Sequence, residues 1–228
     1  DLLLLSDTNG NAGGQVRISN GINASTSGGA ITVAGGNLTG TGYAVGTTTS
    51  TAEGIRMEGD LDFNSAGGNI TFRGKSRDAT SAQSAGIGIY NSGSALDINS
   101  GTGEITIVAV SQASNTSNHN YDAGLYLHGT NKITSAKTSG TAITIVADGM
   151  GTSLSTPTTA GQGDGFLIAG GTTTIQTTAG GAIDIDTYGT TQEVGQQNIE
   201  PFGVLNILSS SGAISVDGLT NTTDGIYI

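Results

Sequence analysis

Apolar and polar residues alternate in short blocks, and each block follows a glycine-containing turn. The block recurs six times, at residues 28–33 (GGAITV), 67–72 (GGNITF), 102–107, 139–145, 180–185 and 211–216. Alternation with a period of two places the apolar side chains on one face of a β-strand. An internal repeat of this length predicts a solenoid in which each repeat adds one coil.

Residues 54–72 show one coil most clearly. Short alternating strands are predicted at 55–57, 61–63 and 69–72, with turn residues between them. We therefore expect an all-β parallel β-helix of about six three-stranded, triangular coils. Two smaller coils per repeat are an alternative, which we disfavour because the segments between repeats lack a second set of apolar triplets. Pro201 should distort its coil, since proline cannot donate a ladder hydrogen bond.

Spacing along the chain predicts where the coils differ. The forward path changes little, from 15 residues between Val16 and Ile31 to 18 between Ile87 and Ile105. The return path varies more, from 24 residues between Ile31 and Ile55 to 12 between Ile214 and Ile226. Each coil should thus carry an insertion of variable length at one corner. We expect a single β-helix over residues 1–228 that is part of a longer repetitive fibre.

Composition and charge exclude several classes of partner. The net charge is −11 with only seven Lys and Arg, which disfavours a nucleic-acid partner because such surfaces need clustered cations. No apolar run approaches the roughly 18 residues of a membrane span, so we expect no membrane insertion of this segment. Nothing in the sequence calls for a cofactor.

The chain resembles a known protein family in two features, its glycine-bounded apolar triplets and its lack of cysteine. The triplets at residues 54–57 (GIRM), 95–98 (ALDI) and 182–185 (AIDI) resemble the shaft of filamentous haemagglutinin-like adhesins. Those are exoproteins of the two-partner secretion route, and autotransporter passengers look similar. The resemblance implies a right-handed helix on the cell surface of a Gram-negative bacterium. No ligand-binding residue carries over from the family.

The function we expect is therefore structural and adhesive. A rigid rod would present loops to a glycan or protein on a host or neighbouring cell, or to other copies of the fibre. A self-assembling sheath or surface-layer filament is the alternative. A polysaccharide-active enzyme on the same scaffold ranks below both, because the acids are scattered. Asp62 and Asp97 occupy equivalent positions without a partnering base, and Asp184 and Asp186 should point to solvent.

The candidate contact residues lie in or at the edges of the insertions, because loops on rigid scaffolds commonly carry binding. These candidates are Tyr43, His119, Tyr121 and Tyr188. Asp7, Asn9 and Asn11 resemble the first half of a calcium loop, with oxygens at alternate positions, but Ile18 stands where the loop needs its bidentate acid. A polar turn is the simpler reading of that segment.

Five Asn-x-Ser/Thr sequons occur, at Asn23, Asn37, Asn69, Asn115 and Asn221. Such sequons are acceptors for N-linked sugars where they lie in surface loops. In a chain this rich in Asn, Ser and Thr, chance accounts for most of them. Asn69 leads directly into a predicted strand, where a glycan would fit poorly.

Overall fold

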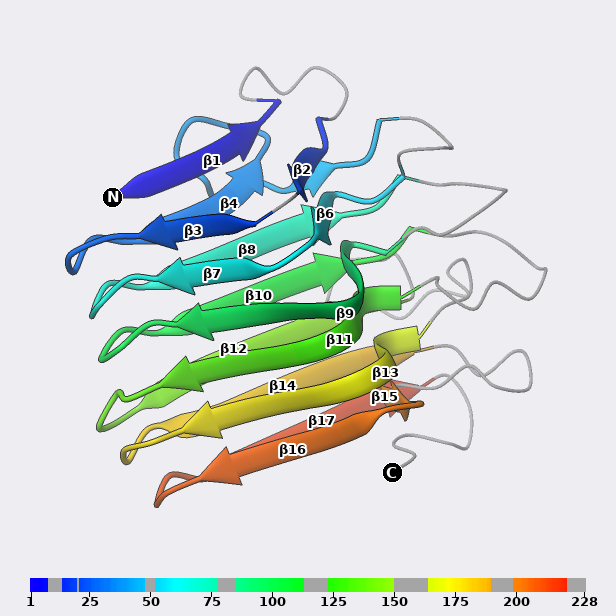
Figure 1. The fold of residues 1–228 in the computed structure, drawn as a ribbon. Helices are drawn as coiled ribbons and strands as arrows, with labels where there is room; N and C mark the ends of the chain where they lie inside the picture. The colour runs from blue at the N-terminus through cyan, green and yellow to red at the C-terminus, as the bar shows by residue number, and fades with distance from the viewer. Residues whose placement is uncertain are drawn as a thin grey trace.

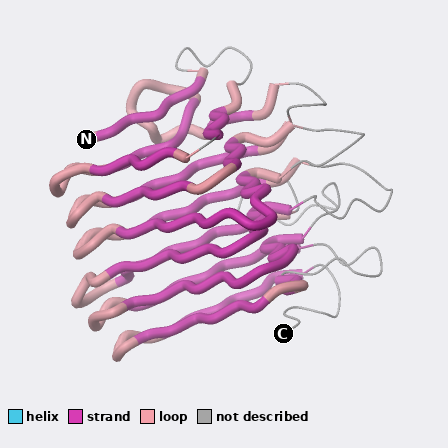
Figure 2. Tube along the Cα trace, viewed as in Figure 1, coloured by secondary structure: helices cyan, strands magenta, loops and turns pink. Residues whose placement is uncertain are grey.

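The computed structural model describes residues 1–7, 14–19, 21–47, 52–77, 85–112, 123–149, 164–189 and 199–220. Within these ranges the chain forms strands and turns, and Figure 2 shows no helix among them. None of these residues belongs to a helix with the length and apolar character that a membrane crossing requires. The fold is an all-β parallel β-solenoid, which confirms the predicted fold class.

Two facing sheets make up the solenoid (Figure 1). Sheet A contains β1 (Leu2–Ser6), β4 (Ile31–Gly35), β5 (Ala44–Val45), β8 (Ile70–Lys75), β10 (Ile105–Val110), β12 (Thr141–Asp148), β14 (Ala182–Gly189) and β17 (Ile214–Thr220). Sheet B contains β2 (Val16–Ser19), β3 (Ile22–Ser25), β6 (Ile55–Glu58), β7 (Leu61–Asn64), β9 (Ile87–Asn99), β11 (Ala123–Ser135), β13 (Asp164–Thr177), β15 (Ile199–Pro201) and β16 (Val204–Ser209).

The coil is right-handed, as the family resemblance implies. In Figure 1 the near strands β7, β9, β11 and β13 run to the left, and the far strands β8, β10 and β12 run to the right, while the chain descends. The neighbouring strands within each sheet pair in parallel, for example β8 with β10 and β10 with β12.

The predicted three-stranded coil is confirmed, and its strands are divided between the two sheets. The first two predicted strands of each repeat lie in sheet B, and the third lies in sheet A. Gly59, with φ of 88°, bends the chain between β6 and β7. In β11 and β13 the bend is absorbed inside one long strand, at a register shift next to Gly129 and Gly171. Both glycines have positive φ, as a bulge of this kind requires.

The number of regular coils is smaller than predicted. About three turns are built from one long strand in each sheet: β9–β10, β11–β12 and β13–β14. The turns on either side use shorter strands. In the last of them, sheet B is interrupted at Phe202 and Gly203, directly after Pro201. The same corner is also interrupted between β6 and β7, where no proline is present, so the distortion expected from Pro201 stays a prediction.

The core lies between the sheets and consists of residues stacked in register. The isoleucine column in sheet A joins one residue from each repeat: Ile31, Ile70, Ile105, Ile143, Ile183 and Ile214. The first five are buried, while Ile214 is 45% exposed in the last strand of the sheet. The stacking confirms that each repeat adds one level to the sheet. Each buried isoleucine contributes roughly 1.5–3 kcal/mol.

Hydroxyl groups line the turns that lead from sheet B to sheet A, buried at Ser100 and Ser135 and half-buried at Ser209. Ser100 Oγ donates a hydrogen bond of 2.7 Å to the carbonyl of Gly103, and Ser209 Oγ makes the same bond to Gly212. Ser135 Oγ donates to the Gly103 carbonyl from the next coil, at 2.8 Å. A serine or threonine three residues before the turn glycine thus stabilises the turn through this hydrogen bond. The alternation of apolar and polar residues alone does not predict this role.

Candidate functional site

The variable segments leave the solenoid at one edge. Every sheet A strand followed by such a segment, such as β8, β10 or β12, is connected through it to the next sheet B strand. The opposite edge has short turns of four or five residues, at 26–30, 65–69, 100–104, 136–140, 178–181 and 210–213. Figure 1 shows these two edges on opposite sides of the molecule. The predicted placement of insertions at one corner is therefore confirmed by the strands that flank them.

One loop departs from this rule. Residues 36–43, called the Asn37 loop below, leave the solenoid between β4 and β5, and both of these strands pair with β8. The loop is therefore an excursion from within sheet A. An isolated antiparallel bridge between Gly35 and Gly42 closes its base.

Tyr43 ends this loop and has a packing partner. The guanidinium carbon of Arg73 lies 4.7 Å from the centre of the Tyr43 ring, in a cation–π contact. The tyrosine is half-buried. Its ring therefore holds the end of the loop against sheet A, and its role as a ligand contact stays a prediction.

Tyr188 lies near the end of β14, beside a group of acids. Burial raises the pKa of its hydroxyl, and the nearby carboxylates of Asp186, Asp148 and Asp217 raise it further. Asp148 is its register neighbour in β12 and is buried. The ring thus lies on sheet A, at the edge of the variable segment that follows β14.

Three carboxylates gather on sheet A where the sequence suggests scattered acids. Asp184 and Asp186 lie in β14, Asp217 is the register neighbour of Asp186 in β17, and carboxylate oxygens of all three lie within 4.8 Å of one another. Burial raises the pKa of Asp186, and the charges of Asp184 and Asp217 add to the shift. Oxygen ligands of this kind suit a hard divalent cation. The sequence predicts that Asp184 and Asp186 point to the same side of their strand. It does not predict that Asp217 joins them, because that depends on how β14 and β17 pair in register.

Replacing Asp186 by asparagine should stabilise the protein at pH 7 by about 0.2–1 kcal/mol, because like charges directly opposite in a sheet repel. The folded-state pKa is raised above the ordinary value of 3.8, so the folded state binds the proton more tightly. The stability of the wild-type chain therefore falls as pH rises from about 3.8 through the raised pKa of the folded state. The gain in stability of D186N should vanish below about pH 3.8, where Asp186 is protonated in both states. Urea unfolding at several pH values measures the difference.

Glu104→Gln is the matched control, since Glu104 pairs with Lys137 instead of with other acids. That variant should be neutral or less stable at pH 7. An equal gain in both variants would show that relief of net negative charge, and not the local cluster, explains the effect.

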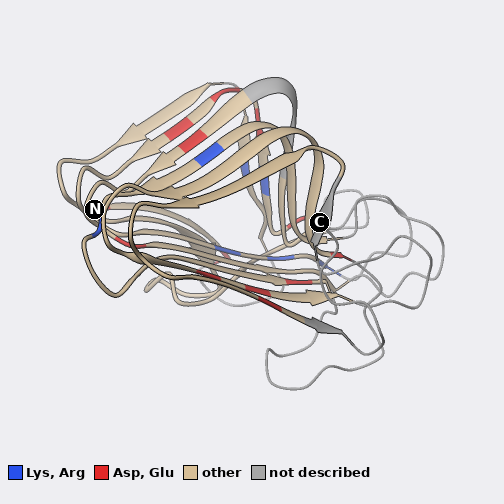
Figure 3. Cartoon of the chain, turned by 90° about the horizontal axis from the view of Figure 1, so that it is seen from below, with Lys and Arg blue, Asp and Glu red and all other residues tan. Residues whose placement is uncertain are grey.

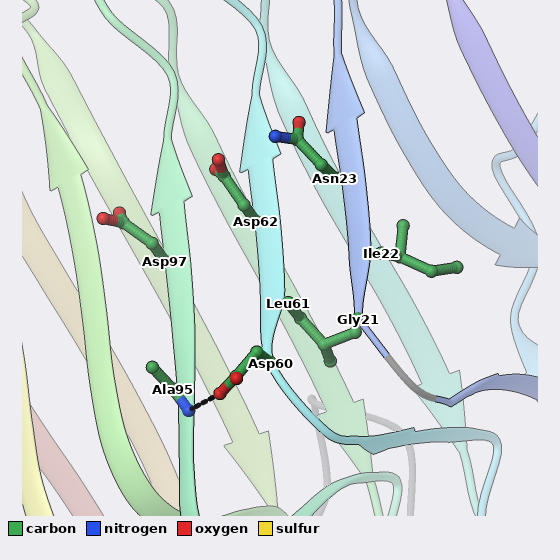
Figure 4. A pocket seen from close by; sticks show the side chains of 8 residues that line it. All are labelled: Gly21, Ile22, Asn23, Asp60, Leu61, Asp62, Ala95 and Asp97. Atoms are coloured by element: carbon green, nitrogen blue, oxygen red, sulfur yellow. Dashed lines mark hydrogen bonds between the residues drawn. The ribbon is translucent and has the colours of Figure 1, made fainter.

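A second polar site lies on the outer face of sheet B. Asn23, Asp62 and Asp97 are register neighbours in β3, β7 and β9 and point to the same side (Figure 4). They line an open groove of about 370 Å³ together with Asp60, whose carboxylate accepts a hydrogen bond of 2.9 Å from the Ala95 amide. The predicted equivalence of Asp62 and Asp97 is confirmed. Figure 3 shows acidic positions on both sheets, with basic positions beside some of them.

The remaining predicted residues have separate surroundings. Asp7 is half-buried with φ of 46°, and the two other calcium candidates, Asn9 and Asn11, lie outside the described residues. His119 and Tyr121 also lie outside them. The other histidine of the chain, His128, lies in β11, where its ring meets Tyr126 edge-on with centres 6.5 Å apart. The structure thus leaves the calcium site and the two loop contacts as predictions.

Comparisons with protein-family models, with curated proteins and with solved structures find no match to this chain.

Proposed function

We propose that the chain is a rigid segment of a secreted bacterial surface fibre, which presents its variable segments for attachment. The observation that carries this proposal is the combination of in-register stacking with insertions at one edge. The family resemblance extends the proposal to export from a Gram-negative bacterium and an extracellular location. The partner would be a glycan or protein on a host or neighbouring cell.

Stiffness and repetition supply the mechanism. Successive coils are held about 4.8 Å apart by backbone hydrogen bonds, and side chains of the same type stack between them. Loops attached to such a scaffold lie in a row at fixed spacing. Weak contacts made in series raise the overall affinity because each later contact forms at high effective concentration.

Attachment of coated beads tests the proposal. Beads carrying residues 1–228 should adhere to a panel of epithelial cells, bacteria or immobilised glycans. A variant with residues 113–122 and 150–163 each replaced by a four-residue turn should lose attachment by about tenfold or more, as expected when multivalent contacts are removed. Circular dichroism would verify that the variant keeps its β-structure.

A control variant carries glycine–serine segments of the original length at the same two places. It separates loss of specific side chains from loss of loop length. Adhesion that persists in the shortened variant, or that is absent from every surface in the panel, would contradict the attachment role. If the chain released reducing sugar from a polysaccharide, the result would contradict the attachment role and indicate an enzyme.

Self-assembly into a sheath or surface-layer filament is the second candidate. It would use the same parallel strand pairing between copies that joins successive coils within the chain. Concentration-dependent filaments without cell attachment would support this candidate instead.

A further inference from the structure

The Asn37 loop contains a sequon, Asn37-Leu38-Thr39, on the outside of sheet A. We propose that Asn37 is an acceptor for an N-linked sugar. Its side-chain amide nitrogen would take a glycosyl group from an activated donor, a sugar linked through phosphate to a nucleotide or a lipid. This inference concerns modification of the chain and is independent of the attachment role.

Three donors converge on the amide oxygen of Asn37. The backbone N–H and the hydroxyl of Thr39 donate to Asn37 Oδ1 at 3.2 and 2.9 Å, and the backbone N–H of Thr41 donates at 3.2 Å. The amide nitrogen donates to Thr41 Oγ1 at 2.8 Å. The Thr39 and Thr41 hydroxyls are 3.0 Å apart and complete the network. The loop therefore holds the sequon in one defined turn.

This arrangement favours the chemistry of glycosyl transfer. An amide nitrogen is a poor nucleophile because its lone pair is delocalised into the carbonyl. Loss of one N–H proton to a base of the transferase shifts negative charge onto Oδ1, and three preorganised donors stabilise that charge as an oxyanion hole does. The nitrogen then forms a bond to the anomeric carbon of the sugar, the carbon–oxygen bond to the donor breaks, and the phosphate group leaves with the bonding electrons.

The loop is also accessible to an enzyme. Leu38 is 74% exposed, and Thr39 is exposed beside it. Gly36 and Gly40, with φ of 76° and 70°, allow the tight turns on either side of the sequon. The base of the loop is closed by the Gly35–Gly42 bridge, so a transferase could reach the turn without opening the solenoid.

The other two described sequons are built differently. Asn69 Oδ1 accepts a hydrogen bond of 2.9 Å from the Glu104 amide, which ties one coil to the next, and the buried Ile70 follows it directly. Asn23 lies inside β3, where Ser25 pairs with Asn64 of β7. An extended strand directs its amides into the ladder and cannot converge them on its own side chain. The structure therefore separates one sequon from two others that the motif alone treats alike.

Transfer to the purified, folded chain tests the proposal. The chain is incubated with UDP-glucose and a soluble sequon-specific N-glycosyltransferase that has been shown to modify a peptide of residues 34–44. Intact mass should rise by one hexose at Asn37, located by peptide mapping, while Asn23 and Asn69 stay unmodified. N37Q and T39A should lose the modification, and T39S should keep it.

Thr41→Val tests the role of the loop itself, because it keeps the sequon and removes the hydroxyl that Asn37 contacts. Transfer to the folded T41V chain should be several-fold slower than to wild type, with equal rates on the two matching peptides. N69Q should leave transfer at Asn37 unchanged. Modification of the peptide but not of Asn37 in the folded chain would overturn the proposal, as would occupancy of Asn23 or Asn69 equal to that of Asn37.

Discussion

Replacing Phe72 by alanine is expected to lower the free energy of unfolding by about 3–5 kcal/mol, the range for removing a buried aromatic side chain. Phe72 is 1% exposed and packs edge-on against Phe63, with ring centres 5.2 Å apart and planes at 89°. The pair joins β8 of sheet A to β7 of sheet B. Its loss therefore weakens contact between the two sheets as well as stacking within one of them.

The cost should be near the upper end of that range because the site cannot collapse easily. Phe72 is held in register between Val33 and Ile107 by the strands on either side. The side chain also lines a small apolar void in the core together with Met57, Ile87 and Leu96. Removing the ring enlarges an existing space between backbones that hydrogen bonds hold in place.

Urea unfolding followed by circular dichroism measures this effect, with two controls. Phe72→Leu keeps most of the apolar volume and should cost about 1.5 kcal/mol or less. Leu38→Ala removes an exposed side chain and should change stability by less than about 0.5 kcal/mol. A loss of less than about 1 kcal/mol in F72A would contradict the buried position of the ring between the two sheets.

Gly103→Ala is the second large effect, expected to cost about 2–3 kcal/mol through overpacking. A Cβ atom at residue 103 would lie 2.1 Å from the carbonyl oxygen of Gly68 in the preceding coil. The clash is with backbone, so no side-chain rotation relieves it. Gly212 stands in the same relation to Gly181, also at 2.1 Å. The turn glycines are therefore required by the close approach of successive coils.

Gly140→Ala separates the effect of a clash between coils from the effect of backbone strain. Gly140 has φ of 64°, and the nearest atom to its added Cβ is the flexible Lys137 Nζ at 3.6 Å. The cost there should be about 1–2 kcal/mol, the penalty for an L-residue in a left-handed conformation. Thermal unfolding of both variants compares the two. A larger loss in G140A than in G103A would contradict the close approach between coils.

Much of the fold was predictable because each strand pairs with its counterpart in the next repeat. Ile70, for example, needs only its own repeat to mark it as inward-facing, and repetition then places it between Ile31 and Ile105. The short turns were predictable from the glycine before each block and from the nearly constant number of residues between the first and third strands of a repeat. The edge that carries the insertions follows from the variable return spacing.

The candidate sites depended on contacts that no single repeat contains. Asp186 and Asp217 meet only because β14 and β17 are neighbours, and Tyr43 meets Arg73 only because the Asn37 loop leaves from within sheet A. Asn37 and Asn69 share a motif and differ in what surrounds their amides.

Sequence alone determined the parallel solenoid, the inward face of each strand and the edge of the insertions, since these follow from local alternation and from repetition. Tertiary structure decided that the first two strands of a repeat share one sheet, which carboxylates gather and which sequon is held in a turn. These features depend on how the chain bends at Gly59 or Gly129 and on which side chains stacking brings together across about 30–40 residues. Local patterns do not encode distances of that kind.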